Sequence, residues 1–208
     1  MDIVHPDIVE YLLGVTPERD EVLSDMENVA LERNFPIIGP LVGRTLFVLA
    51  RSVEARHVLE LGSGFGYSAY WFAKAIGKDG VVVCTDGDRL NADRAKEYFR
   101  RGRLTAQIDF RIGDALKITD DLDGPFDIIF NDLDKHQYPK AFRKAVPKLR
   151  KGGLLISDNV LWHGDILTKK PDANTAGILT YNRLIYSSKE LFTSILPIRD
   201  GLSVSVKL

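Results

Sequence analysis

Short apolar runs alternate with helical stretches from His57 to Ser157, and this alternation constrains the fold more than any other feature of the chain. It predicts strands near 57–61, 81–85, 108–112, 126–131 and 153–157, with helices between them. Strands that alternate with helices in this way form a parallel sheet covered on both faces. The sequence therefore predicts an α/β fold.

The amino-terminal part is expected to be helical. Thr16 is a candidate cap and Pro17 a first-turn residue for one helix, which should end before Pro36. Pro40 then opens a second apolar helix that continues through Val53.

The carboxyl end breaks the alternation. An Asp-Gly pair lies between apolar runs at 191–198 and 202–207 and predicts a hairpin, so the last strand should be antiparallel. Without repeats or flexible linkers, we expect one domain over residues 1–208, with helices over 1–53 and an α/β core over 54–208.

The composition favours a small-molecule partner. The 208 residues are 45% hydrophobic, and Lys and Arg are spread along a chain of formal net charge −1. A chain without a basic cluster lacks the electrostatic footprint of nucleic-acid or anionic-membrane binding. No run approaches the roughly 18 apolar residues of a membrane span, and the first residues do not form a leader, so we expect a cytoplasmic protein. Cys84, the single cysteine, is expected to be a buried strand residue.

A glycine-rich turn follows the first predicted strand, at Glu60-Leu61-Gly62-Ser63-Gly64-Phe65-Gly66. Glycines in such a turn let backbone amides come close to a ligand. A dinucleotide fingerprint would need its third glycine where Tyr67 stands. The spacing therefore favours a nucleoside that carries an amino acid and no pyrophosphate. A tight strand-to-helix turn without a ligand stays open as the alternative.

Acidic residues follow the next two predicted strands. Asp86 closes the second strand, where a carboxylate can accept hydrogen bonds from both ribose hydroxyls, and Asp88 is the better helix cap, which should leave Asp86 freer for the ligand. Gly113-Asp114-Ala115 follows the third strand. Because such strand ends converge on the ligand crevice of open α/β sheets, we expect adenine near Asp114 and Ala115.

Oxygen-bearing side chains end the fourth and fifth predicted strands. Asp132 and Asp158 follow strands expected to be neighbours, and two adjacent carboxylates repel one another unless a cation relieves them. Asn159 adds a neutral oxygen. An all-oxygen set predicts Mg²⁺ first, with Ca²⁺ or Mn²⁺ as alternatives, rather than zinc. That both aspartates only cap the following segments stays open.

Lys135 is the candidate general base. It lies shortly after Asp132, at the start of a helix that should run to about Arg150, and a dication and a helix N-terminus both disfavour its charged form. His136 is the rival base, although nothing beside it in the sequence orients its ring.

Three residues are candidates for the acceptor pocket: Asp134, Trp162 and His163. The Trp162 indole would give a flat ring an apolar wall, and it could equally be a core residue. The aromatic residues after the glycine turn are expected to be mostly core: Tyr67, Tyr70, Trp71 and Phe72.

At these residues the chain resembles the cation-dependent O-methyltransferases of the catechol and caffeoyl-coenzyme A type. Three motifs match in order and spacing: Glu60-Leu61-Gly62-Ser63-Gly64-Phe65-Gly66-Tyr67-Ser68, Asp132-Leu133-Asp134-Lys135-His136-Gln137-Tyr138 and Asp158-Asn159-Val160-Leu161-Trp162. The resemblance implies a Rossmann-like class I methyltransferase fold, with a seven-stranded, mostly parallel sheet, an antiparallel C-terminal strand and helices on both faces. It also implies S-adenosylmethionine as the methyl donor, and a homodimer.

The resemblance assigns roles to individual residues. S-adenosylmethionine would be contacted by Glu60, Gly62, Ser63, Ser68, Asp86 and Ala115, to which the turn and strand ends add Gly64, Tyr67, Asp114 and Asp132. The divalent cation would be held by Asp132, Asp158 and Asn159, with Lys135 as the base. Departures from the usual family residues stand at Asn131, Leu133 and His163, and they bear on the acceptor more than on the reaction.

The sequence as a whole predicts an enzyme, a divalent-cation-dependent O-methyltransferase acting on a small vicinal dihydroxy aromatic. An amino-terminal part shorter than that of plant relatives favours a free phenol or catechol over a coenzyme A thioester. The alternatives are a methyltransferase for a non-phenolic small molecule and a catalytically silent adenosine-binding module. Glycine spacing disfavours a nicotinamide oxidoreductase. Asn131-Asp132-Leu133-Asp134 stands where a nucleic-acid or amine methyltransferase would typically carry Asn/Asp-Pro-Pro-aromatic.

Overall fold

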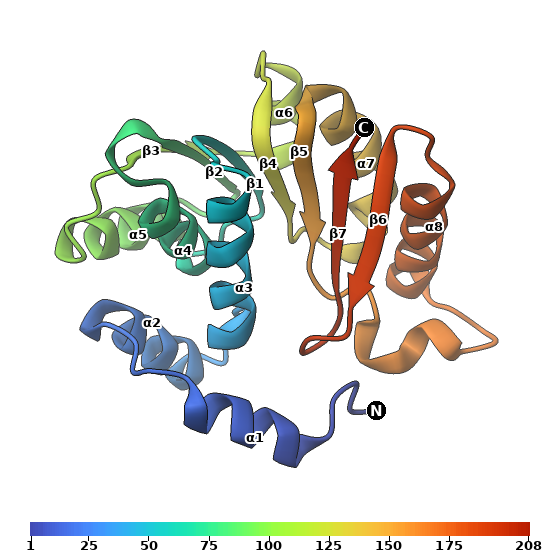
Figure 1. The fold of residues 1–208 in the computed structure, drawn as a ribbon, viewed down its shortest axis with the longest axis horizontal. Helices are drawn as coiled ribbons and strands as arrows, with labels where there is room; N and C mark the ends of the chain where they lie inside the picture. The colour runs from blue at the N-terminus through green and yellow to red at the C-terminus, as the bar shows by residue number, and fades with distance from the viewer.

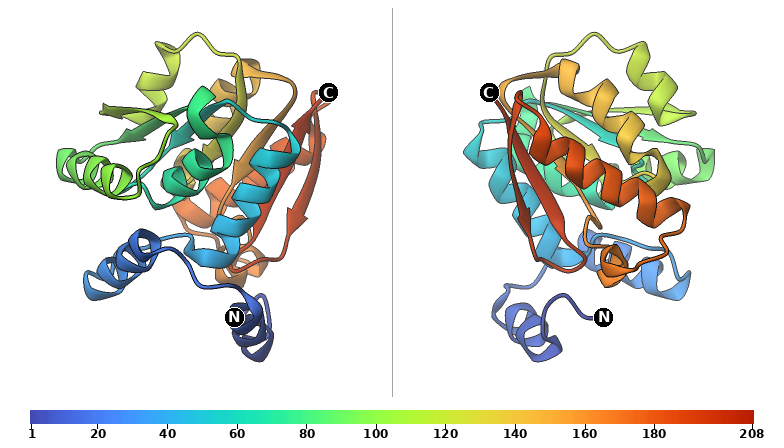
Figure 2. Two further views of the ribbon diagram at one scale, coloured as in Figure 1. Left: turned by 60° about the vertical axis from the view of Figure 1, so that its left-hand side comes forward. Right: turned by 90° about the vertical axis from the view of Figure 1, so that its right-hand side faces the viewer.

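The computed structural model describes residues 1–208 and contains one seven-stranded sheet with helices on both faces (Figures 1 and 2). The strands are β1 His57–Leu61, β2 Val81–Asp86, β3 Gln107–Ile112, β4 Phe126–Asn131, β5 Leu149–Ser157, β6 Leu191–Leu196 and β7 Leu202–Lys207. Their order across the sheet is β3-β2-β1-β4-β5-β7-β6. Every neighbouring pair is parallel except that β7 runs antiparallel to β5 and β6. The predicted α/β fold with an antiparallel last strand is confirmed.

The helices divide between the two faces of the sheet. They are α1 Pro6–Val15, α2 Glu21–Glu32, α3 Gly39–Ser52, α4 Tyr67–Ile76, α5 Arg89–Arg101, α6 Ala115–Asp120, α7 Tyr138–Ala145 and α8 Ala173–Ser187. One core joins the sheet to α2, α3, α4 and α5, and a second core joins its other face to α6, α7 and α8. No helix combines the length and apolarity that crossing a bilayer requires.

Successive residues of the central strands enter opposite cores. Val58 and Ile128 belong to the first core, whereas Leu59 and Ile129, the next residues along each strand, belong to the second. A strand buried on both faces favours apolar residues at successive positions, which is why β1 contains Val58-Leu59 and β4 contains Ile128-Ile129-Phe130. Cys84 is fully buried in β2, as predicted.

The start of α2 was predicted wrongly, because the sequence pattern placed its cap at Thr16. Thr16 ends α1, which the sequence pattern did not predict, and α2 begins after Asp20, whose carboxylate accepts a hydrogen bond from Leu23 N at 2.9 Å. The same carboxylate pairs with Lys74 Nζ of α4 at 2.5 Å, so a contact distant in sequence holds this cap in place. Helix α3 agrees with the helix predicted from Pro40 to Val53 to within one residue at each end.

The helix after β4 is shorter than predicted. A 3₁₀ turn at Lys135–Gln137 (η2) leads into α7, and a second one at Val146–Lys148 contains Pro147. Proline is tolerated at the start of such a turn but not within a continuing helix. Arg150, expected near the helix end, lies instead in β5 and pairs with Asp127.

Candidate active site

The carboxyl ends of β1, β2, β4 and β5 border one cavity of about 410 Å³. The predicted site residues on its wall are Gly62, Ser63, Gly64, Tyr67, Ser68, Asp86, Asp132, Asp134, Lys135, Asp158, Asn159, Trp162 and His163. Such a crevice beyond the strand ends is the usual ligand position in open α/β sheets. The structure thus brings most of the predicted site together.

The turn after β1 requires glycine at two positions. Gly62 has φ +85°, and a Cβ there would lie 2.7 Å from the carbonyl oxygen of Asp132. Gly66 has φ +90°, and a Cβ there would lie 2.7 Å from the ring of Phe99. Residues with a side chain rarely adopt these conformations. Glycine at these two positions therefore lets the turn after β1 lie closer to the loop after β4 and to α5 than a residue with a Cβ would allow.

The amides of this turn are already engaged within the chain. Gly62 N and Ser63 N donate to the side-chain and backbone oxygens of Thr85 at 3.3 and 2.8 Å, and Gly64 N donates to Asp86 Oδ2 at 3.0 Å. Gly62 and Gly64 consequently offer a ligand a surface without side chains, and Phe65 N is the amide of this turn that has no partner within the chain.

Asp86 is held more firmly than expected. Besides Gly64 N, its carboxylate accepts hydrogen bonds from Asp88 N at 2.8 Å and Asn91 Nδ2 at 3.1 Å. Asp88 caps α5 through Leu90 N, as predicted. The cap therefore does not leave Asp86 free, although a carboxylate with two oxygens has further acceptor capacity for ribose hydroxyls.

Three residues expected to contact S-adenosylmethionine do not line the cavity. Glu60 is fully buried in β1, both of its carboxylate oxygens lack a hydrogen-bond partner, and burial raises its pKa to about 7. Asp114 caps α6 by accepting from Leu116 N and Lys117 N at 2.8 and 3.2 Å, and Ala115 packs in the second core.

Asp158 is a buried carboxylate with one oxygen unpartnered. Its side chain is 1% exposed, and Oδ2 accepts a hydrogen bond from Arg199 Nη1 at 3.1 Å. Oδ1 has no partner in the chain. Burial, followed by the negative charge of Asp132, raises the pKa of Asp158 to about 7. The site thus contains a carboxylate whose charge the protein alone compensates incompletely.

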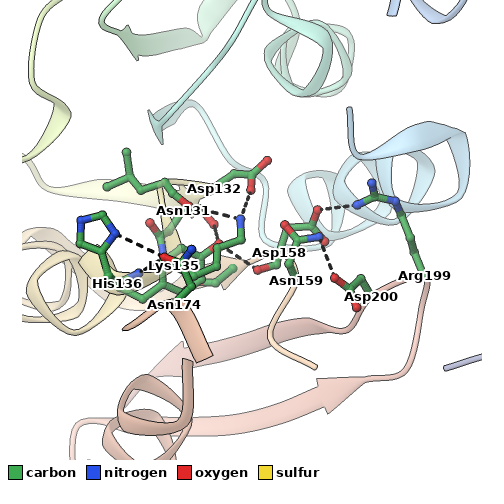
Figure 3. Close-up of polar contacts among 12 residues, drawn as sticks. Asn131, Asp132, Lys135, His136, Asp158, Asn159, Asn174, Arg199 and Asp200 are labelled. Carbon is green, nitrogen blue, oxygen red and sulfur yellow. Dashed lines mark hydrogen bonds and ion pairs between the residues drawn. The ribbon is translucent and has the colours of Figure 1, made fainter. Parts of the chain in front are cut away.

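The two other predicted metal ligands lie beside it (Figure 3). Asp132 Oδ1 accepts from Lys135 Nζ at 2.9 Å, and Asn159 Nδ2 donates to Asp200 Oδ2 at 3.3 Å. Each of the three side chains therefore has one polar atom held by the chain and one oxygen left over. Carboxylates and amides whose second atom is hydrogen-bonded suit a hard cation. The set holds only two carboxylates, and no three His, Cys, Asp or Glu side chains converge elsewhere.

Lys135 is buried at the cavity wall and fixed by three elements. Its Nζ also donates to Leu133 O at 3.2 Å and lies 5.2 and 5.7 Å from the ring centroids of Tyr138 and Trp162. A Cβ at Gly177 would come within 2.3 Å of the Lys135 carbonyl, so α8 packs directly on this backbone. Trp162 is half-buried: it lines the cavity and also packs against the second core.

His136, the rival base, points elsewhere. Its ring is exposed, with Nδ1 3.4 Å from Asn174 Oδ1, and it does not line the cavity. The four aromatic residues after the glycine turn are all buried, as predicted. Tyr67 also lines the cavity, and its hydroxyl donates to Glu27 Oε1 of α2 at 2.6 Å.

Sequence reasoning missed Arg199 and Asp200, which join the site from the β6–β7 connection. Asp200 is buried, and besides Asn159 Nδ2 it accepts a hydrogen bond from His163 N. The available signal was the Arg-Asp-Gly turn, which predicted only a hairpin. Four non-glycine residues here have positive φ: Asn159, Trp162, His163 and Arg199, at 56°, 45°, 53° and 50°. Such strained backbone clusters at functional sites.

The glycine turn after β1, the acidic end of β2 and the antiparallel β7 define a class I methyltransferase fold. The O-methyltransferase family model matches residues 16–208. A catechol O-methyltransferase of Niastella koreensis is 30% identical over 94% of this chain and 94% of that protein. Caffeoyl-CoA O-methyltransferase 1 of Arabidopsis thaliana is 26% identical over 95% of this chain and 83% of that protein.

Solved structures agree with these relatives. An O-methyltransferase from Bacillus cereus, in complex with SAH, superposes with a TM-score of 0.88, is 28% identical and covers 97% of each chain. The O-methyltransferase TomG from Streptomyces achromogenes, in complex with SAM, has a TM-score of 0.88 and 26% identity over 97% of this chain and 96% of that chain. The chain belongs to this family and is an S-adenosylmethionine-dependent O-methyltransferase.

Proposed function

We propose that the protein is a divalent-cation-dependent O-methyltransferase of a small vicinal dihydroxy aromatic. The proposal rests on Asp132, Asp158 and Asn159, each of which has one polar atom engaged within the chain and one oxygen without a partner. These three residues would hold the cation. When bound, a divalent cation supplies Lewis-acid chemistry that makes a neighbouring hydroxyl more acidic.

The size and lining of the cavity support a small planar acceptor. About 410 Å³ is at the small end of ligand pockets, and it extends from the glycine turn to the Trp162 indole. We place the methyl donor beside Gly62 and Asp86 and the acceptor ring against Trp162. A relative that is a catechol O-methyltransferase adds weight to this class of acceptor.

Lys135 is the proposed general base. Its Nζ lies 2.9 Å from Asp132 Oδ1 at a wall that is nearly closed to water. In the reaction Nζ, as the neutral amine that keeps its two N–H groups on Asp132 and Leu133, takes the proton of the acceptor hydroxyl on its lone pair, and the oxygen forms a bond to the sulfonium methyl carbon. The carbon–sulfur bond breaks with its electron pair going to sulfur, which leaves S-adenosylhomocysteine. The residues of the wall hold donor and acceptor in line.

The test is methylation of 4-methylcatechol with S-adenosylmethionine, read out as product mass. We expect product with Mg²⁺, its loss in excess chelator and its return when Mg²⁺ is restored. 5-Methylresorcinol, whose hydroxyls are not adjacent, is the matched control and should yield little product. Full activity in excess chelator contradicts the role of the cation, and equal rates on the two diols contradict the acceptor class.

A further inference from the structure

Arg199 places a positive charge at the cavity that one carboxylate only partly engages. A single guanidinium nitrogen, Nη1, contacts Asp158 Oδ2 at 3.1 Å, and no other hydrogen bond of this side chain is formed. The side chain is 38% exposed and lines the cavity. A guanidinium carries several N–H donors in one plane, so most of those of Arg199 remain available to a ligand.

The backbone holds Arg199 in this position at a conformational cost. Its φ of +50° is left-handed, and the next residues of the turn, Asp200 and Gly201, are anchored through backbone contacts with Leu161 and Val160. A Cβ at Gly201 would lie 2.4 Å from the side chain of Leu161, so the hairpin tip packs tightly on the loop after β5. The arginine is consequently fixed over the acceptor end of the site (Figure 3).

A bound cation would compete with Arg199 for Asp158. Asp158 and Asp132 face Arg199 and Lys135 in the structure. A divalent cation on the two aspartates would compensate both carboxylates by itself. Asp200, the remaining buried carboxylate, accepts from Asn159 Nδ2 and His163 N and forms no ion pair with the Arg199 guanidinium. With the cation bound, the only carboxylate in contact with Arg199 would therefore be one that the cation also holds.

A second cavity adjoins the first and could hold a substituent of the acceptor ring. It measures about 390 Å³ and shares Ile38, His163 and Arg199 with the first cavity. Much of the rest of its wall is apolar and comes from the first residues of the chain, α1 and the start of α3. Arg199 stands where the two cavities meet, so a group that extends from the first cavity into the second would pass its guanidinium.

We propose that Arg199 selects an acceptor that carries a carboxylate, so that the substrate class is a vicinal dihydroxy aromatic acid with a short arm. This inference rests on the proposed function. The carboxylate accepts hydrogen bonds from the Arg199 N–H groups that Asp158 does not engage. Guanidinium and carboxylate geometries match for paired hydrogen bonds, which fixes the ring as well as binding it.

The experiment compares 3,4-dihydroxybenzoate with its methyl ester, which keeps the ring and both hydroxyls and removes the charge. We expect kcat/KM of the wild-type enzyme to favour the acid by about 10- to 100-fold, mostly through KM. Arg199→Gln should bring the ratio of acid to ester close to one, and Arg199→Lys should retain part of it. The ratio within each variant is the readout, so a general loss of activity does not obscure it.

Arg103→Gln is the matched control. Arg103 is also an exposed arginine with positive φ, at 49°, but it lies in the turn between α5 and β3, away from both cavities. This variant has the same charge change and should keep the wild-type ratio. A wild-type enzyme without a preference for the acid, or an Arg199→Gln variant that keeps the preference, overturns the proposal.

Calorimetry with S-adenosylhomocysteine and Mg²⁺ separates this proposal from the proposed function. It measures binding of acid and ester without turnover. If the acid binds more tightly than the ester, Arg199→Gln abolishes this difference and neither compound is methylated, the inference is supported and the proposed function is contradicted. If both compounds are methylated and bind with equal affinity, the proposed function is supported and the inference is contradicted.

Discussion

The two sides of the active site differ in how their polar groups are satisfied. The donor side, comprising 62–68 and 86, uses glycine for its positive φ angles and engages the turn amides internally. The acceptor side, comprising 132–135, 158–163 and 199–200, uses residues with side chains at positive φ and keeps charged groups buried with incomplete partners. The donor side is preformed, and its one unpartnered buried carboxylate, Glu60, lies in β1 just before the turn, whereas the acceptor side stores backbone strain and several buried charges.

This difference indicates where the specificity of the enzyme lies. The donor is the same in every reaction of the family, so a turn whose amides are mostly engaged within the chain suffices. The acceptor side must hold a cation, a base and a variable substrate, and it draws on β4, β5 and the distant β6–β7 hairpin to do so. Disturbing one side should therefore leave the other largely unchanged, and the following predictions test that independence.

Lys135→Met should have the largest effect and should affect only the acceptor side. Removing the base is expected to lower kcat by about 100- to 10,000-fold. Binding of S-adenosylmethionine, measured by calorimetry, should stay within a few-fold of the wild type. Lys140→Met, an exposed lysine of α7 with the same charge change, is the control. If kcat stays within a few-fold of the wild type, Lys135 is not the base, and water accepts the proton instead.

Asp158→Asn should remove most of the cation affinity. The variant keeps the shape of the side chain but loses the buried charge, and we expect Mn²⁺ binding, followed by electron paramagnetic resonance, to weaken by at least about 100-fold. Asp134→Asn is the matched control, because Asp134 lines the same cavity and is exposed. Equal losses in both variants would mean that general charge, rather than the three-residue set, attracts the cation.

The sequence predicted the donor side and the strands because both follow from local pattern. The predicted limits of β1 and β4 coincide with those of the structure, since strands buried on both faces are rich in apolar residues. Glycine spacing likewise identified a turn whose Gly62 admits no side chain. These features need only neighbours in the chain.

Features that depend on distant partners were missed. Arg199 looked like an ordinary hairpin residue because its partner, Asp158, lies 41 residues earlier. Asp20 was overlooked as the cap of α2 although its carboxylate is fixed by Lys74, 54 residues later. Local signals cannot show which of two possible partners a polar side chain will meet.

Glu60→Gln tests the donor side through pH. Burial raises the pKa of Glu60 to about 7, above its value in the unfolded chain of about 4.3. Its contribution to stability is therefore fully present below about pH 4 and is lost as pH rises through about 7. Glu60→Gln should remove this part of the slope and stabilise the protein at pH 8 by a few kcal/mol in denaturant unfolding.

Mg²⁺ distinguishes the contribution of Glu60 from that of Asp158. The raised pKa of Asp158 makes the unfolding free energy fall with pH in the same direction. Added Mg²⁺ should restore stability at pH 8 in both the wild type and Glu60→Gln, because it acts on the acceptor side. An unfolding free energy of Glu60→Gln that keeps the full wild-type pH dependence would show that Glu60 titrates normally.

Gly62→Ala should have the smallest effect of the four and should be confined to the donor side. With φ at +85° and the Asp132 carbonyl 2.7 Å from the new Cβ, we expect a loss of about 1–3 kcal/mol in unfolding free energy and weaker binding of S-adenosylhomocysteine. Gly14→Ala, where a Cβ would meet nothing within 4 Å, should be neutral or slightly stabilising. Mn²⁺ affinity should be retained in Gly62→Ala. A simultaneous loss of cation binding would show that the two sides are coupled through the contact between Gly62 and the backbone of Asp132, and the independence argued above would fail.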